Sequence, residues 1–228
     1  MTSMIDAALT GARAGAFFAA FLPFMRRLAA CGAHNGVIQS VLKLTAPGVP
    51  DLYNGTELWD LSMVDPDNRH DVDYATRWRM LEQLEAALQA DRGGCMRQLW
   101  QDWCDGRIKL ATIATLLSHR RSYPELYTDG DYQPMAVLGP GSEEICAYAR
   151  TAGQQILIVA VARYPRRREQ QGFADDTLLA VAEPLRRRRW RELLSGRTLV
   201  LAAEHFRAAE LFRDLPAAVL AADEPDGA

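Results

Sequence analysis

Apolar residues recur at helical spacing near the start of the chain. Between residues 11 and 31 they fall three or four positions apart, at Phe17, Phe21, Phe24 and Leu28. This period predicts a helix over 11–31, and Gly32 is placed to end it. A second apolar run at 36–46 predicts another helix, which the following Pro-Gly pair ends.

The pattern then changes to strand, loop and helix. Residues 49–54, "VPDLYN", are short and apolar in alternation, which favours a buried strand. A long polar loop is expected over 55–72. Asp73 is a suitable N-cap for a helix that we expect to end at the glycine pair 93–94. Another helix is expected after Gly106, so the order is typical of an α/β layer.

From about Tyr132 the hydrophobic period shortens from near 3.6 to 2, with some continuous apolar runs. These runs are separated by turn residues and lie at 132–139, 143–150, 154–164, 176–182, 198–203 and 215–222. The pattern predicts a mostly β second half, with a boundary near residues 127–134. The chain as a whole is therefore expected to be α+β.

Composition is that of an ordinary globular protein with no general affinity for polyanions. The 228 residues are 49% hydrophobic and 24% charged, with a net charge of −3. That balance predicts no attraction to nucleic acid or to an anionic membrane. The arginine-rich runs at 163–169 and 186–192 lie between β segments, so we interpret them as solvated hairpin tips rather than a nucleic-acid surface.

The cysteines and the N-terminal apolar run indicate a cytoplasmic protein. The four cysteines form no CxxC pair, which argues against a zinc ribbon or a disulfide scaffold. Arg26 and Arg27 follow the apolar run, whereas a signal peptide carries its positive charge before it. The run itself is too short to span a bilayer, so an amphipathic helix is the better interpretation.

Residues 55–73 combine carboxylates, fixed donors and aromatic rings. The polar members are Glu57, Asp60, Asp65, Asp67, Asn68 and Arg69. Such groups can pair with sugar hydroxyls, and Tyr53 and Trp59 offer flat faces for a pyranose ring. Taken alone, the segment is more typical of a turn cluster that caps its own backbone, the role we expect for Asp65 and Asp73.

Two further features of this region were weighed. Four aspartates fall within nine positions, but an EF-hand needs Gly where His70 stands and Glu where Thr76 stands, so no metal and no cofactor are predicted. Lys109 lies at a helix start, where the dipole disfavours cations. This position suggests that Lys109 reaches outward, towards a sugar or a neighbouring loop.

Residues 42–74, "LKLTAPGVPDLYNGTELWDLSMVDPDNRHDVDY", closely resemble the segment around the eighth barrel strand of the maltooligosyltrehalose synthases, a family of the α-amylase superfamily. The segments 105–135 and 190–196 resemble later parts of the same family, so the similarity covers roughly residues 17–220. Asn54 stands where the family usually has Gln. His70 and Asp71 replace the usual Arg-Pro, which removes a cation and a rigid turn.

The resemblance implies a fold and a site. Residues 1–130 would form the last helix–strand–helix portion of a (β/α)8 barrel, and 131–228 a mostly antiparallel C-terminal β domain. The implied substrate is a maltooligosaccharide, whose reducing-end α-1,4 linkage the family converts to α,α-1,1 by intramolecular transglucosylation. The residues expected to bind it are Tyr53, Glu57, Trp59, Asp67, Asn68, Arg69 and Lys109.

The catalytic groups are expected to lie outside this chain. A complete barrel takes about 250 residues, and the family supplies its catalytic carboxylates from strands that precede anything present here. A retaining glycoside reaction needs two carboxyl groups only about 5–5.5 Å apart. We therefore expect no catalytic residue here, no activity by the chain alone, and a partner that supplies the N-terminal barrel portion.

Two alternatives remain open from the sequence. The chain can be a non-catalytic maltooligosaccharide-binding module, including the subunit of a split enzyme. A weaker alternative is a small glycosidase that uses a carboxylate pair such as Glu57 and Asp67.

Overall fold

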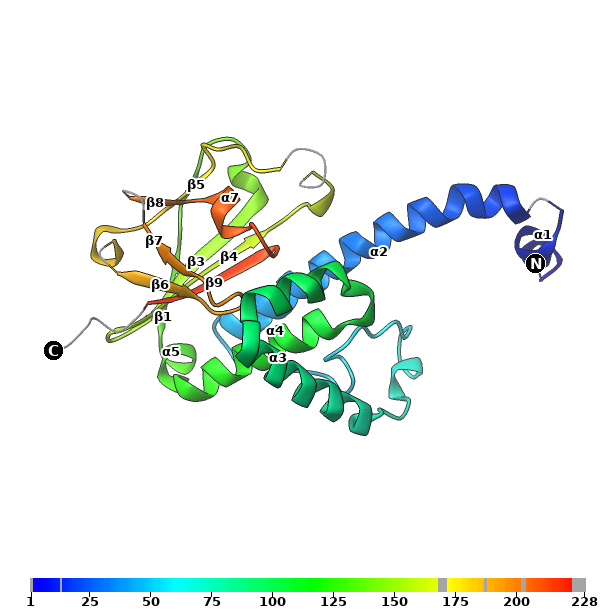
Figure 1. Cartoon of the computed structure of the whole chain (residues 1–228), viewed down its shortest axis with the longest axis horizontal. Helices are drawn as coiled ribbons and strands as arrows, with labels where there is room; N and C mark the ends of the chain where they lie inside the picture. The colour runs from blue at the N-terminus through cyan, green and yellow to red at the C-terminus, as the bar shows by residue number, and fades with distance from the viewer. Residues whose placement is uncertain (1, 13, 168–171, 187, 202–203, 223–228) are drawn as a thin grey trace.

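The computed structural model describes residues 2–12, 14–167, 172–186, 188–201 and 204–222. Helices come first along the chain and antiparallel strands follow, as the hydrophobic periods predict (Figure 1). The main helices are α1 (Thr2–Thr10), α2 (Ala14–Thr45), α3 (Tyr74–Gln101), α4 (Arg107–Ser122) and α5 (Pro124–Thr128).

Helix α2 is continuous, so the predicted break at Gly32 is wrong. The helix passes through both Pro23 and Gly32 and ends at Thr45. A glycine inside a helix costs only about 1 kcal/mol. Burial of Val37, Val41 and other side chains of the C-terminal half outweighs that cost.

The length of α2 also corrects the expectation that the N-terminal run is too short for a bilayer. The helix has 32 residues and is, by length and composition, able to cross a membrane, although the core helix of a soluble protein passes the same test. Its two halves differ in environment. The C-terminal half is buried in the protein, whereas Phe24 and Leu28 in the other half are 60% and 61% exposed.

The strand predicted at 49–54 does not form. The segment is irregular, and Val49 is 95% exposed. A strand exists only where a neighbour pairs with its backbone N–H and C=O groups. No strand of the described structure lies beside this segment to do so. The following loop is confirmed, interrupted by one 3-10 turn at Asp67–Arg69.

Helix α3 begins as predicted but continues past its expected end. Asp73 caps it by accepting the Thr76 backbone N–H at 2.9 Å. The chain bends at Asp91, where φ is −150°, instead of stopping at the glycine pair 93–94, and the helix resumes to Gln101. The Asp91 carboxylate accepts the Gly94 N–H at 2.9 Å, so the signal read as a stop is a kink.

The strands form two antiparallel sheets. The larger has the order β1-β3-β4-β9-β6-β7 and the smaller β2-β5-β8. Their bounds are β1 Asp131–Pro134, β2 Val137–Leu138, β3 Ile145–Ala152, β4 Gln155–Ala162, β5 Leu178–Ala180, β6 Arg189–Glu192, β7 Thr198–Val200, β8 His205–Arg207 and β9 Ala217–Ala222. Strand β4 lies between β3 and β9 and is almost entirely buried.

Alternate side chains of the large sheet enter two different cores. Leu157 and Val159 of β4 pack with the helices, in the same cluster as Val41 of α2. Ile158 of β4 points to the opposite face and packs with Trp190 against the small sheet. One hydrophobic cluster therefore joins the helices to the sheet across residue 130.

A buried glutamate organises the segment 190–196. Glu192 accepts the backbone N–H groups of Leu194, Ser195 and Val219 at 3.1, 2.5 and 3.1 Å. A carboxylate bound to three N–H groups is well satisfied when buried. This arrangement fixes the turn after β6 to strand β9.

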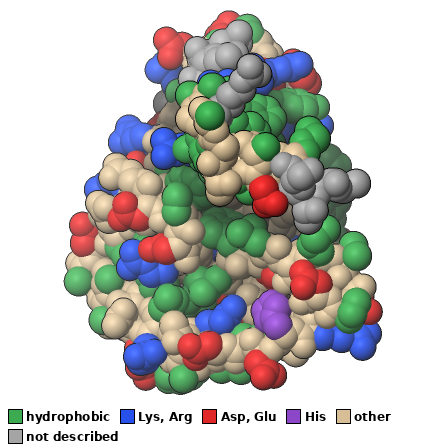
Figure 2. Space-filling view, turned by 90° about the vertical axis from the view of Figure 1, so that its right-hand side faces the viewer, with side chains coloured by type: hydrophobic (Ala, Val, Ile, Leu, Met, Phe, Trp, Pro, Cys, Tyr) green, Lys and Arg blue, Asp and Glu red, His purple; other side chains and the backbone are tan. Residues whose placement is uncertain are grey.

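Helices α3, α4 and α5 lie on one face of the large sheet, and the N-terminal half of α2 projects away from the body of the protein (Figure 1). Viewed from the side of that projection, hydrophobic side chains gather across the middle of the face (Figure 2). The exposed hydrophobic residues of α1 and α2 are Met4, Ile5, Leu9, Phe17, Phe21, Phe24, Met25 and Leu28.

Candidate functional site

The loop between α2 and α3 starts with a tight turn. Thr56 donates both its backbone N–H and its hydroxyl to the Tyr53 carbonyl, at 3.0 and 2.7 Å. Gly55 has φ +85°, and a Cβ there would lie 3.1 Å from Val72 Cγ2. Only glycine meets both conditions without strain. The turn leaves the Tyr53 side chain 45% exposed at the edge of the loop.

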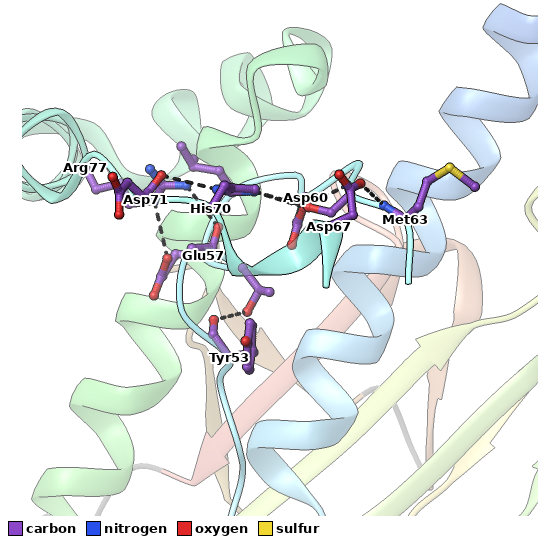
Figure 3. Close-up of polar contacts among 12 residues, drawn as sticks. Tyr53, Glu57, Asp60, Met63, Asp67, His70, Asp71 and Arg77 are labelled. Atoms are coloured by element: carbon purple, nitrogen blue, oxygen red, sulfur yellow. Dashed lines mark hydrogen bonds and ion pairs between the residues drawn. The ribbon is translucent and has the colours of Figure 1, made fainter. Parts of the chain in front are cut away.

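Glu57 and Arg77 form the charged centre of the loop (Figure 3). Glu57 Oε2 and Arg77 Nε lie 3.4 Å apart, with the side chains 27% and 20% exposed. Arg77 also donates to the Gly55 carbonyl at 3.0 Å. The facing Oε2 and Nε atoms are buried and make no hydrogen bond within the described residues. The two atoms face each other in the ion pair, which holds the loop against α3.

Trp59 is anchored from three sides. Its indole N–H donates to the Trp103 carbonyl at 2.6 Å. Gly36 of α2 lies beneath the ring, where a Cβ would approach Trp59 Cζ3 to 2.8 Å. The Lys109 ammonium lies 5.7 Å from the ring centroid and donates to the Leu58 carbonyl at 3.2 Å. Lys109 thus reaches the neighbouring loop, one of the two roles expected for it, and helps to hold Trp59 in place.

Asp60, Ser62 and His70 form a second polar group in the loop, and Figure 3 labels Asp60 and His70. Ser62 donates its backbone N–H to Asp60 at 2.9 Å, and its hydroxyl also bonds to the same carboxylate. The bond from the Ser62 hydroxyl lowers the pKa of Asp60 most, and the bond from the backbone N–H lowers it further. His70 Nε2 lies 3.2 Å from Ser62 Oγ. The His70 substitution noted in the sequence therefore places an imidazole at this group.

A cavity of about 390 Å³ separates this polar group from the Glu57–Arg77 pair. Its lining consists of Gly55, Trp59, Asp60, Leu61, Ser62, Asp67, His70 and Arg77. Asp67 enters the lining while accepting the Met63 backbone N–H at 2.6 Å. The volume falls within the range of small-molecule sites, which is roughly 300–1,000 Å³.

Asn68 and Arg69 lie apart from the charged centre. Arg69 makes two hydrogen bonds to the Asp65 carboxylate, at 2.6 and 3.0 Å, with both side chains more than half exposed. Asn68 Oδ1 is buried without a hydrogen-bond partner among the described residues. Neither residue lines the cavities that Arg77 borders.

A second cavity of about 610 Å³ lies on the other side of Arg77. Its lining consists of Glu57, Tyr74, Ala75, Arg77, Trp78, Arg79, Leu81 and Leu110. Tyr74 and Trp78 are 55% and 64% exposed. Neither these two aromatics nor Arg77 is among the binding residues expected from the sequence, although an exposed aromatic pair at i, i+4 beside a polar loop is typical of a stacking surface.

The arrangement is suited to binding. It brings together Glu57, Trp59, Asp67 and, through the loop, Lys109. Flat rings beside bidentate polar groups are able to hold a hydroxyl-rich ligand. Among the described residues, no group of three His, Cys, Asp or Glu side chains is arranged to hold a metal ion.

Comparison with known proteins places the chain in a family. No protein-family model matches it. A maltooligosyl trehalose synthase that occurs in two strains of Mycobacterium tuberculosis is 39% identical over 189 residues, which is 83% of this chain and 20% of the relative. The chain belongs to the maltooligosyltrehalose synthase family. It spans about a fifth of the length of these relatives.

Solved structures agree with this family. A variant of the maltooligosyltrehalose synthase from Arthrobacter ramosus is 31% identical, with a TM-score of 0.75, over 97% of this chain and 26% of that one. Another maltooligosyl trehalose synthase has a TM-score of 0.68 at 22% identity, covering 97% of this chain and 26% of that chain. An Anoxybacillus α-amylase shares the fold at a TM-score of 0.50 and 16% identity, over 85% of this chain and 33% of that chain.

Proposed function

We propose that this chain forms the C-terminal part of a maltooligosyltrehalose synthase activity, (1->4)-α-D-glucan 1-α-D-glucosylmutase. The reaction converts the reducing-end α-1,4 linkage of a maltooligosaccharide to α,α-1,1. In this proposal, residues 1–130 are the last portion of a (β/α)8 barrel and 131–228 are its C-terminal β domain. The protein would act in the cytoplasm.

The observation that carries the proposal is the pair of cavities that Arg77 and the loop border. The smaller cavity is lined mostly by residues 42–74, the segment that resembles the family most closely, and the larger one mostly by the start of α3. Asp60 and Asp67 in the smaller cavity supply acceptors for sugar hydroxyls, and Arg77, which lines both cavities, supplies donors. Trp78 offers an exposed face in the larger cavity.

The chain's share of the reaction is binding and exclusion of water. A covalent glucosyl intermediate must be kept from water while the released glucose turns and attacks it. The loop closes over one side of such a pocket. The catalytic carboxylates would come from the preceding barrel portion, because Glu57 is paired with Arg77 and Asp67 with the Met63 backbone.

The exposed half of α2 is where we place that barrel portion. The helix carries no charged residue between residues 14 and 25, and a helix that is apolar on all faces is normally surrounded by other protein or by lipid. The family members extend several-fold beyond this chain, which favours protein as the cover.

The test is the formation of an α,α-1,1 linkage from maltopentaose, measured as the loss of reducing ends. We expect none from the chain alone and detectable product when it is co-expressed with the preceding part of the Mycobacterium tuberculosis relative. Activity of the chain alone would show that the catalytic groups are misplaced in this account. A mixture that stays inactive although both parts are soluble and associated would contradict the shared-site proposal.

A non-catalytic maltooligosaccharide-binding role is the second candidate, favoured by the open cavities of the isolated chain. Isothermal titration with maltopentaose distinguishes the two. Binding at millimolar concentration or tighter without a partner supports the module. A silent titration, together with activity in the co-expressed mixture, supports the enzyme part.

A further inference from the structure

A third cavity, of about 370 Å³, lies between α4 and the large sheet and shares no lining residue with the loop site. Its walls come from α3, α4, α5 and the strands β4, β6 and β9, which lie side by side in Figure 1. The volume is that of a small-molecule site, for which roughly 300–1,000 Å³ is usual. It is larger than a single phosphate ion requires.

Two guanidinium groups enter this cavity without a facing carboxylate. Arg92 of α3 and Arg191 of β6 line it, and its lining residues include no Asp or Glu. Burial lowers the pKa of Arg92, and the positive charge of Arg191 lowers it further. Glu192 also lies near Arg92, but its carboxylate is occupied by backbone N–H groups, including that of Ser195. A bound anion would relieve the repulsion between the two arginines.

The existing contacts leave the arginines available. Arg92 Nη1 donates to Thr115 Oγ1 and to the Leu193 carbonyl, both at a long 3.3 Å. Arg191 forms no ion pair within 4.0 Å among the described residues. An arginine fork binds phosphate through two parallel hydrogen bonds, so each of the two guanidinium groups is chemically suited to a phosphate.

The rest of the lining is suited to a hydroxyl-bearing group. Thr115, Ser118 and Ser122 lie on one face of α4, at i, i+3 and i+7. Gln155 Oε1 is buried and has no hydrogen-bond partner among the described residues. A buried acceptor of this kind requires a donor, and a sugar hydroxyl supplies one.

We propose that this cavity binds a phosphomonoester of sugar-phosphate size, with the phosphate between Arg92 and Arg191 and a sugar hydroxyl donated to Gln155. The site is separate from maltooligosaccharide binding at the loop. A negative result for the sugar-phosphate site would leave the proposed function unchanged, and a negative result for the proposed function would leave this site unchanged.

The experiment is isothermal titration of the full chain with glucose 6-phosphate, inorganic phosphate and glucose at low ionic strength. We expect glucose 6-phosphate to bind, inorganic phosphate to bind more weakly and glucose to give no heat. Arg191→Ala should weaken glucose 6-phosphate binding at least tenfold. Arg189→Ala removes the same charge from the same exposed side of β6 outside the cavity and should change affinity less than twofold.

Two results would overturn the proposal. One is the absence of binding by both phosphate probes, and the other is an equal loss of affinity in Arg191→Ala and Arg189→Ala, which would indicate diffuse charge. Gln155→Leu tests the sugar part: affinity for glucose 6-phosphate should fall about threefold or more while that for inorganic phosphate is retained. Equal effects on the two probes would refute the hydroxyl contact.

Discussion

Arg150 joins the helices to the sheet, and its replacement should destabilise the whole chain. The side chain is 1% exposed and lies on β3. Its guanidinium donates to the carbonyls of Thr45, Tyr127, Gly130 and Asp131, at 3.0, 3.2, 2.9 and 3.2 Å. These carbonyls belong to the ends of α2 and α5 and the start of β1, where helix geometry leaves acceptors unpaired.

The magnitude follows from the acceptors left behind by Arg150→Met. The bonds to Thr45 and Tyr127 are buried, and each buried acceptor that loses its partner costs about 1–3 kcal/mol. The two together cost about 2–6 kcal/mol. Removal of the buried cation itself returns part of this, since its desolvation is no longer required. We expect a net loss of about 2–4 kcal/mol, a large share of the roughly 5–15 kcal/mol typical of a domain.

Urea unfolding followed by far-UV circular dichroism measures this loss. Arg150→Lys keeps the charge but not the planar fork, so it should fall between wild type and Arg150→Met. Arg166→Ala, at an exposed position, is the matched control and should change the unfolding free energy by less than about 0.5 kcal/mol. A loss below about 1 kcal/mol for Arg150→Met would refute the view that this residue ties the two halves together.

Three further predictions concern single side chains. Burial lowers the pKa of His119 from 6.5 to about 4. Between these values the unfolded chain binds more protons than the folded one, so the unfolding free energy should fall as the pH drops from 6.5 to 4. His119→Gln should reduce this pH dependence, measured by urea unfolding. Gly36→Val should displace Trp59 and cost about 1–3 kcal/mol, with a changed near-UV spectrum; an unchanged spectrum would contradict the contact. Trp78→Ala should weaken any maltopentaose binding severalfold at an unchanged urea midpoint; equal affinity would exclude Trp78 from the site.

The fold was predictable from the sequence where the hydrophobic period and local chemistry agreed. The Asp73 cap and the helix after Gly106 are both confirmed. In each case an aspartate accepts a backbone N–H two or three residues further along the chain, at Thr76 and at Arg107. The helix break predicted at Gly32 is wrong, whereas the one predicted at 93–94 occurs two residues earlier, as the kink at Asp91. Glycine only lowers local helix propensity, and long-range packing decides whether the helix continues.

The candidate site was less predictable because its geometry depends on contacts between distant elements. The polar loop and its carboxylates were evident from composition. The pairing of Glu57 with Arg77 and the support of Trp59 by Gly36 were not, since they join residues separated by 20 or more positions. Arginine and glycine at helix positions carry no local signal that marks them for a site.

The missing strand at 49–54 and the exposed half of α2 have one physical explanation. A strand needs a hydrogen-bonding neighbour, and a helix that is apolar on all faces needs cover on all sides. Among the described residues, no strand pairs with 49–54 and nothing covers the exposed half of α2. Where the helices meet the large sheet, by contrast, the hydrophobic core is buried. The segment 49–54 leads directly into Gly55, which lines one of the cavities that Arg77 borders. A single added body that paired with 49–54 and covered α2 would therefore also close the proposed sugar site, which is why we expect binding and activity to depend on the same partner.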